Sequence, residues 1–571
     1  MPGPHANLFL AGPFSQQATI ETLSDDVLLI IFLHCLDDSP QHWPTLVHVC
    51  QNWREVVFKS PLSLHLRLYC TYGTPVLKTL DCWPSLPLVV NYGGSPMLDS
   101  PAPEDEENIT AALKQSGRVS SISLTITNSL VEKLSAISEP FSELEDLALL
   151  SRDNMQLTLP STFWWGRRLR TLYSTRIAFP SLPQLLLPSQ DLVDLQLHEI
   201  PSNGHFYPEA FANALCGMTQ LRTLSLHFLS LPPRRNYLGL PPPSGERVVL
   251  PTLTCLKYRG TSKYLDSFVA RIDAPRLGDI DITFFSQPTM DASELGRFIE
   301  RIEMQTSLSQ ADVQTSAHAI SICFSEPGAP NTLLELQISC EQLDWQLSSM
   351  TQICNQFSPF LSRVEDLGIY TAKSPTGQDG MDGEQWVELI RAFGGANEFR
   401  VAGGLAIDIL RALGLAGGEY RTDANVLPAL HNLRVQEPMP IDGPLWDAAK
   451  SFITSRRFSG RPVESYVSRF LCHICNSTIF TQQQELKRHL AVRHAYRIVC
   501  SYCGDFEYIP GYTGSRLFRE HLTSKHPEVA PTDTRISNPA LQSFFPYPQD
   551  DPDLDLFGPF TELEAPNVPK A

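Results

Sequence analysis

Residues 20–62 are the first segment for which the sequence predicts regular structure, because apolar residues recur there at helical spacing. They repeat every three or four positions through Val27–Leu36, directly after Ser24–Asp26, a capping serine and two acids that favour a helix N-terminus. A second helix is predicted after Pro44. Its apolar side would comprise Leu46, Val49, Cys50, Trp53, Val56 and Val57. Because two short helices cannot bury both apolar faces alone, the pattern predicts a partner or a following domain.

The residues of this block have the order L-S-D-D-V-L-x-x-I-F, a polar loop, and L-V-x-V-C-x-x-W. This order resembles an F-box, although Ser24 stands where that family usually has proline. The resemblance implies docking on a Skp-type adaptor that links the chain to a cullin ubiquitin ligase. The residues that would carry docking are Leu23, Val27, Leu28, Ile31, Phe32, Leu46, Val49 and Trp53. The alternative is a helical cap on the next domain. Residues 63–108 follow as a connector, similar to fungal F-box proteins in Leu66–Val90 and ending in an acidic, proline-rich linker.

A strand-like motif, L-x-x-L-x-L or a near form, then recurs through residues 109–465. Its clearest copies start at Leu144, Leu169, Leu192, Leu221, Leu253 and Leu277, which are 25, 23, 29, 32 and 24 residues apart. Later copies start at Val364 and Leu430, and Val119 is a candidate first copy. A period in the twenties with this motif is typical of leucine-rich repeats, whose units stack into an α/β solenoid.

The repeat is irregular, because most copies lack the expected Asn or Cys and long insertions interrupt it at 232–251 and 370–385. A general α/β domain with leucine-rich strands is the alternative. From Trp386 the pattern predicts helix, strand and helix, and residues 446–463 predict a closing helix and exit, similar to the end of the repeats in fungal F-box proteins.

Residues beside the second leucine of each motif are expected on the concave, ligand-binding face of a solenoid. Aspartates there are Asp146, Asp194, Asp279, Asp281 and Asp366, with Thr171, Thr223 and Gln196 between them. The hypothesis is a target protein that presents Lys or Arg. The alternative is a set of solvated aspartates without a ligand.

Two cysteine pairs, each followed by a histidine pair, predict two zinc fingers at 470–494 and 498–526. The ligands would be Cys472, Cys475, His489 and His494 for the first Zn²⁺, and Cys500, Cys503, His521 and His526 for the second. A four-cysteine ribbon is the rival arrangement, but two matched histidine pairs argue against it.

The base-facing positions of the first finger would be Gln482, Glu485 and Arg488, suited to A, C and G. The second finger has Gly514, Leu517 and Glu520 there, which offer little to a base edge. The sequence therefore favours zinc as a folding staple or protein-contact module over DNA binding. Residues 527–571 predict a disordered, acidic, proline-rich tail, with an activation or docking segment as a second interpretation.

The composition of the chain argues against several classes of function. The net charge of −18 argues against general binding to nucleic acid or an anionic membrane. Residues 1–19 lack a signal peptide's pattern and predict disorder, and no apolar run is long enough to span a bilayer. Thirteen cysteines without a regular framework predict reduced thiols in the cytoplasm or nucleus. No nucleotide-binding or hydrolase motif occurs, and His198 and His205 lack metalloprotease spacing.

The sequence thus predicts a multidomain α+β protein: a helical F-box, an irregular leucine-rich-repeat solenoid, two ββα zinc fingers and a disordered tail. The expected function is a non-catalytic substrate-recognition subunit of a cullin-type ubiquitin ligase, with a protein target of unknown identity and no membrane partner. The alternative is a zinc-finger transcriptional regulator with an acidic activation tail.

Overall fold

The computed structural model describes residues 23–471, with internal gaps, and residues 479–480. The gaps are 38–39, 73–74, 83–85, 94–102, 138, 152–156, 160–164, 180, 232–246, 304–307, 328–331, 341, 372–382, 417–425, 440–443 and 464. Within these residues the chain is a mixture of 15 α-helices and extensive, mostly parallel β-sheet, which confirms the predicted mixture of helices and strands. The chain divides into two compact units. Unit 1 contains the residues up to Gly260 and Arg271–Pro275, and unit 2 contains Thr261–Ala270 and the residues from Arg276.

Unit 1 opens with helices α1 (Asp25–Asp37), α2 (Trp43–Leu46) and α3 (Gln51–Lys59). The prediction of one second helix was wrong, because the chain breaks it into α2 and α3. Cys50 is extended, with φ −156° and ψ 172°, and its Sγ accepts the backbone N–H of Trp53 at 3.5 Å. This N-cap starts a new helix instead of continuing the previous one.

The sheet of unit 1 contains eight parallel strands whose spatial order equals their chain order. They are β1 (Leu68–Cys70), β2 (Leu88–Tyr92), β3 (Val119–Thr125), β4 (Asp146–Leu150), β6 (Thr171–Thr175), β8 (Asp194–Ile200), β9 (Thr223–Phe228) and β11 (Cys255–Gly260). The predicted strand motifs fall on β3 through β11. The sheet itself begins earlier, because the 63–108 connector supplies β1 and β2.

The repeated leucines explain why these strands stack. The second leucine of each motif lies in register on neighbouring strands and is fully buried. These residues are Leu147, Leu172, Leu195, Leu224 and Leu256. Just before β6, the Glu145 carbonyl accepts the N–H groups of Arg170 and Thr171 at 2.7 and 3.1 Å. The same pair of bonds recurs before β8, β9 and β11, so one backbone rung joins each repeat to the next.

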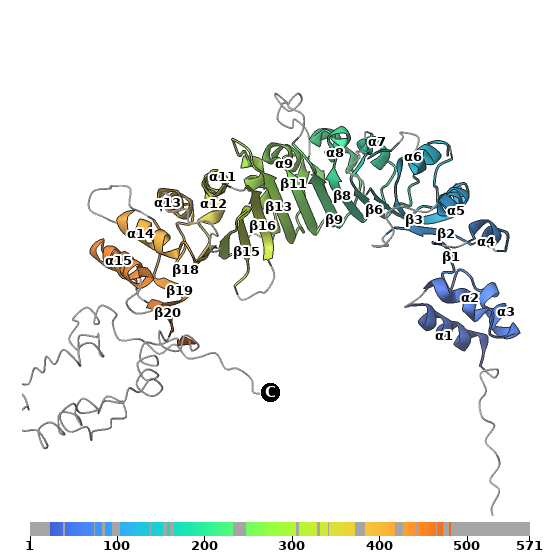
Figure 1. Cartoon of the computed structure of the whole chain (residues 1–571), viewed down its shortest axis with the longest axis horizontal. Helices are drawn as coiled ribbons and strands as arrows, with labels where there is room; N and C mark the ends of the chain where they lie inside the picture. The colour runs from blue at the N-terminus through green and yellow to red at the C-terminus, as the bar shows by residue number, and fades with distance from the viewer. Residues whose placement is uncertain are drawn as a thin grey trace, which may run out of the picture. The chain divides into compact units, whose positions relative to one another are not determined.

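Helices connect the strands of unit 1 and lie along one face of its sheet (Figure 1). They are α4 (Val76–Cys82), α5 (Pro103–Leu113), α6 (Asn128–Ser135), α7 (Leu182–Leu186) and α8 (Pro208–Ala214). The acidic linker was predicted as a loop, but α5 begins inside it. Proline at the first position and Glu104–Glu106 in the first turn suit a helix N-terminus, where negative charge is favoured. Two short parallel pairs, β5 (Leu157–Thr158) with β7 (Ile177–Ala178) and β10 (Val248–Val249) with β12 (Ile272–Asp273), complete the unit.

The sheet of unit 2 is mostly parallel but contains one antiparallel strand between two parallel ones. Its spatial order is β13, β16, β15, β14, β17, β18, β19 and β20. The strands are β13 (Asp279–Phe285), β14 (Gln310–Thr315), β15 (Ala319–Ser325), β16 (Thr332–Ser339), β17 (Asp366–Thr371), β18 (Glu398–Gly403), β19 (Asn432–Met439) and β20 (Ser465–Leu471). Among these eight strands, only β15 runs antiparallel to its two neighbours, β14 and β16. The sequence pattern had not fixed the repeat boundaries between residues 283 and 430.

The helices of unit 2 are α9 (Ser262–Val269), α10 (Ser293–Glu300), α11 (Leu343–Gln356), α12 (Ser358–Leu361), α13 (Gly383–Arg391), α14 (Ala406–Ala416) and α15 (Pro444–Phe458). The predicted helix, strand and helix after Trp386 are confirmed as α13, β18 and α14. The predicted closing helix is α15, but the chain adds β20 after it. Buried Asp266 links two helices, because its Oδ1 accepts the N–H groups of Glu294 and Leu295 at 2.7 and 3.0 Å. Among the described helices, none combines the length and apolar content needed to cross a membrane.

Candidate functional site

The opening helices bury one apolar face and expose another. Leu28, Phe32 and Leu46 are buried, and the Phe32 ring lies 4.7 Å from the Trp53 ring in an edge-on arrangement. These side chains hold the helices together, and Trp43 Nε1 donates to the Arg67 carbonyl at 2.8 Å just before β1. Part of the predicted adaptor set is therefore the helices' own core.

The other predicted adaptor residues reach the surface. Val27 and Val49 are 41% and 58% exposed, while Leu23, Ile31 and Trp53 are half-buried. Sequence reasoning missed Ile30, which is 56% exposed and lies one turn from Val27 on α1, and Phe58, which is 40% exposed on α3. Since α1 is apolar on all sides, its sequence could not show which residues would face outward.

The open face of the unit 1 sheet carries the first two predicted aspartates. Asp146, Thr171, Asp194 and Thr223 align on neighbouring strands, and all four are half-buried. Gln196 donates to Asp194 at 3.1 and 2.9 Å, so this carboxylate already has a partner within its own strand. The predicted alternation of Asp and Thr is present on this face.

Two histidines that the sequence did not relate to each other also meet on this face. The His198 and His227 rings lie 4.5 Å apart, and the Ser225 hydroxyl is within 3.5 and 3.3 Å of their Nε2 atoms. A hydroxyl has one proton, so it can donate to only one of the two rings. Burial lowers the pKa of both rings, that of His227 to about 4, so both are neutral at pH 7.

The open face of unit 2 carries a row of charged and small residues at one level of the sheet. In spatial order they are Asp281, Glu335, Cys323, Asp312, Gly368, Arg400 and Arg434. Burial, reinforced by Asp281, raises the pKa of Glu335. Asp279 precedes Asp281 by two residues on β13, on the same face of the sheet, and is exposed. Carboxylates therefore dominate one end of this row and guanidinium groups the other.

Arg400 neutralises part of the predicted aspartate set. Its Nε donates to Asp366 at 2.7 Å, its Nη2 to Asp312 at 2.8 Å and its Nη1 to the Tyr370 hydroxyl at 2.5 Å. The Asp312 bond crosses the intervening strand at Gly368, where a Cβ would lie 2.3 Å from Asp312 Oδ1. Asp366 thus belongs to an internal network, whereas Asp279 is exposed at the surface.

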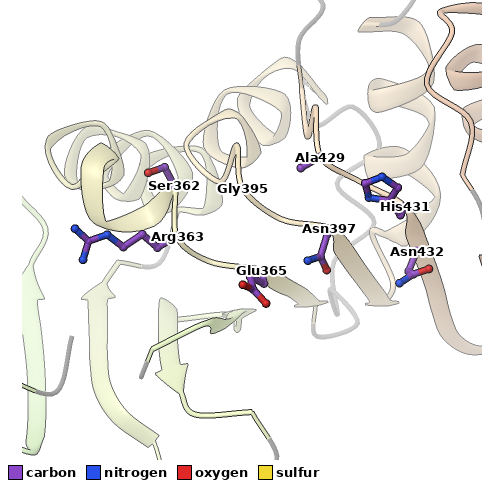
Figure 2. A pocket seen from close by; sticks show the side chains of 8 residues that line it. All are labelled: Ser362, Arg363, Glu365, Gly395, Asn397, Ala429, His431 and Asn432. Carbon is purple, nitrogen blue, oxygen red and sulfur yellow. The ribbon is translucent and has the colours of Figure 1, made fainter. Parts of the chain in front are cut away.

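Unit 2 also has a polar pocket at the start of three neighbouring strands (Figure 2). Its lining is Ser362, Arg363, Glu365, Gly395, Asn397, Ala429, His431 and Asn432. Glu365, Asn397 and His431 each directly precede a strand, and their backbone N–H groups form the inter-repeat rung. The Ser362 hydroxyl donates to the Pro359 carbonyl at 2.9 Å, which stabilises a turn. The pocket suits polar recognition and presents no nucleophile activated by a base among these lining residues.

All eight predicted zinc ligands and the three predicted base-facing residues lie outside the described residues. The described backbone does frame the first cysteine pair. Phe470 and Leu471 of β20 pair antiparallel with Phe480 and Ile479 of β21 (Ile479–Phe480), on either side of the segment that contains it. A C-x-x-C pair between two antiparallel strands is the arrangement that a zinc knuckle requires. Within the described part of the chain, no group of three or more His, Cys, Asp or Glu side chains could hold a metal ion.

No family model matches the chain, and no curated protein matches it.

Proposed function

We propose that this chain is a substrate-recognition subunit of a cullin-type ubiquitin ligase. Its opening helices would dock a Skp-type adaptor, and the open faces of its repeat units would bind a protein target. The observation that carries the proposal is the exposed apolar surface of Val27 and Ile30, which lie one turn apart on α1, together with exposed Val49 in the turn between α2 and α3. Exposed aliphatic residues clustered on one helix are a common mark of a protein interface.

This surface would contribute part of the free energy of a specific complex. Burying a whole Val or Ile side chain contributes about 1.5–3 kcal/mol, so covering the exposed halves of these residues would contribute about 1 kcal/mol each. The half-buried Leu23, Ile31 and Trp53 would extend the contact, and an aromatic residue is a frequent centre of binding energy. Leu28, Phe32 and Leu46 would act indirectly by fixing the positions of α1 and α3.

The repeat units would supply target selection. Parallel strands in register present alternate side chains on one face, which gives a broad surface with rigid spacing. Asp279 and Asp281, with Glu335 beside them, would favour a target that presents Lys or Arg in this part of unit 2. The chain would perform no chemistry itself, because the ligase would act by holding target lysines near a ubiquitin-charged enzyme.

A binding assay with a purified Skp-type adaptor tests the proposal. We expect Val27→Asp combined with Ile30→Asp to weaken binding at least 100-fold, because two apolar contacts are lost and two charges are buried without partners. Leu77→Asp is the matched control, since Leu77 is 66% exposed on α4, outside the opening helices. Circular dichroism of all variants checks that the helices remain folded.

Equal adaptor binding by the double variant and the Leu77→Asp control would refute docking through this surface. A sequence-selected DNA ligand whose affinity depends on Arg488, together with no adaptor binding, would instead favour the zinc-finger regulator predicted as the alternative.

A further inference from the structure

The open face of the unit 1 sheet gathers polar and cationic side chains on β8, β9 and β11. Lys257 on β11 is in register with Ser225 on β9. Arg259 is in register with His227, whose ring lies 4.5 Å from the His198 ring on β8. Because neighbouring strands lie about 4.8 Å apart, these five side chains form one compact group, which we call the basic patch.

Lys257 of the basic patch has no counter-ion among the described residues. Its side chain is half-buried, yet it makes no ion pair or hydrogen bond within the part of the chain that the structure describes. By contrast, Arg400 on the open face of unit 2 is also half-buried and donates to Asp366 at 2.7 Å. A cation that is partly withdrawn from water gains more from a partner than an exposed cation does, so Lys257 favours an anionic ligand.

The two acids that act electrostatically on the histidines already have partners. Asp194 accepts two hydrogen bonds from Gln196. Glu199 forms an ion pair with Arg176. Its backbone is left-handed, with φ 51°, where the register between β8 and β9 shifts. Neither carboxylate therefore neutralises Lys257.

The two histidines can strengthen anion binding by taking up protons. Burial lowers the pKa of both rings, that of His227 to about 4, and the positive charge of Lys257 acts in the same direction. A bound anion would oppose these effects and raise both pKa values, so that binding takes up protons. The titratable and charged groups that face the two rings among the described residues are Tyr173, Asp194, Glu199, Lys257 and Arg259.

We propose that the basic patch binds an anionic oxygen group, and that this group is a carboxylate in an acidic segment of the protein target. Lys257 would supply the charge, and the two histidines and the Ser225 hydroxyl would supply hydrogen bonds. The identity of the ligand as a target side chain rests on the proposed function, whereas oxyanion binding itself does not.

Calorimetric titration of the full chain with sulfate tests the patch, at an ionic strength held constant with chloride. We expect Lys257→Met to weaken sulfate binding about tenfold, because a charge-assisted hydrogen bond is lost, and Lys257→Arg to retain most of the affinity. Lys114→Met is the matched control, since Lys114 is exposed directly after α5, outside the sheet. Circular dichroism checks that every variant is folded.

The pH dependence of the same titration tests the histidines. Sulfate keeps its charge from about pH 5.5 to 7.5, so a change in its affinity over this range measures protons taken up by the protein. We expect the affinity to rise about fivefold as the pH falls through this range. His198→Gln with His227→Gln should remove most of this rise, and an affinity independent of pH would overturn the role of the two rings.

Peptides identify the source of the oxyanion. An immobilised library with a fixed central Glu and random flanks is compared with a library that has Gln at that position. We expect the wild-type full chain to prefer the Glu library and Lys257→Met to lose this preference, because the carboxylate then lacks its cation.

The outcomes separate this inference from the proposed function. Equal sulfate affinity of wild type, Lys257→Met and Lys114→Met would overturn the oxyanion site, whatever the adaptor assay shows. Sulfate binding that depends on Lys257, without a preference for Glu peptides, would overturn the acidic target and identify a small oxyanion as the ligand. Sulfate and Glu-peptide binding without adaptor binding would support the patch and refute the proposed function alone.

Discussion

Gly368→Ala tests whether the Arg400 network organises the open face of unit 2. Gly368 lies on β17 between Asp312 and Arg400, and the Arg400 Nη2 donates across it to Asp312 at 2.8 Å. An added Cβ would lie 2.3 Å from Asp312 Oδ1 and 2.8 Å from the Tyr370 ring, closer than atoms pack. The carboxylate must move, and the Arg400–Asp312 bond is lost.

The expected cost follows from two opposing effects. The side chains of Arg400 and Asp312 are only 12% and 22% exposed, so water screens their interaction weakly. Losing a hydrogen bond between charged groups costs about 1.5–3 kcal/mol. Replacing glycine by alanine returns about 0.4–1 kcal/mol by restricting the unfolded chain. We expect a net decrease of about 1–2 kcal/mol in the free energy of unfolding of unit 2.

Urea denaturation of the full chain measures this change, with hydrogen exchange in β14 and β17 locating it in unit 2. Gly394→Ala is the matched control, because its Cβ would meet no atom within 4 Å, and we expect it to be neutral or slightly stabilising. In an Arg400→Met background the cost of Gly368→Ala should shrink, since the bond it breaks is already absent. Equal stability of Gly368→Ala and Gly394→Ala would refute the role assigned to the glycine.

Four further substitutions test buried polar side chains. Ser174 is buried among leucines and its hydroxyl has no hydrogen-bond partner, so Ser174→Ala should raise the free energy of unfolding by about 1 kcal/mol. Ser120→Ala should lower it by a similar amount, because Ser120 donates to the Leu88 carbonyl. Denaturation curves that rank these two serine variants in the opposite order would contradict this reasoning. Burial raises the pKa of Asp266 to about 6, so its contribution to stability is present below about pH 3.8 and lost as the pH rises through 6. Relative to wild type, Asp266→Asn should therefore gain up to about 3 kcal/mol between pH 4 and 7, and a difference independent of pH would rule this out. Burial lowers the pKa of His227 to about 4, so its contribution is present above about pH 6.5 and lost as the pH falls, and His227→Gln should flatten the acid side of the stability profile.

The candidate docking surface shows what a linear pattern can and cannot specify. The spacing of Leu28 and Phe32 predicted a helix correctly, because periodicity depends only on neighbours along the chain. It did not separate core from surface, since α1 is apolar all round and only packing against Trp53 decides that Phe32 faces inward. The break at Cys50 was also missed, because the apolar positions continue across it.

The sequence by itself predicted strands β3, β4, β6, β8, β9, β11, β13, β17 and β19, because each copy of the motif carries its own buried apolar residues. Tertiary structure decided which strands became neighbours in unit 2, where β16 instead of β14 pairs with β13. It also brought His198 to His227 and Arg400 to Asp312, although these pairs are 29 and 88 residues apart in the chain. Such contacts depend on the register of whole strands, and register follows from the combined packing of every repeat rather than from any one segment.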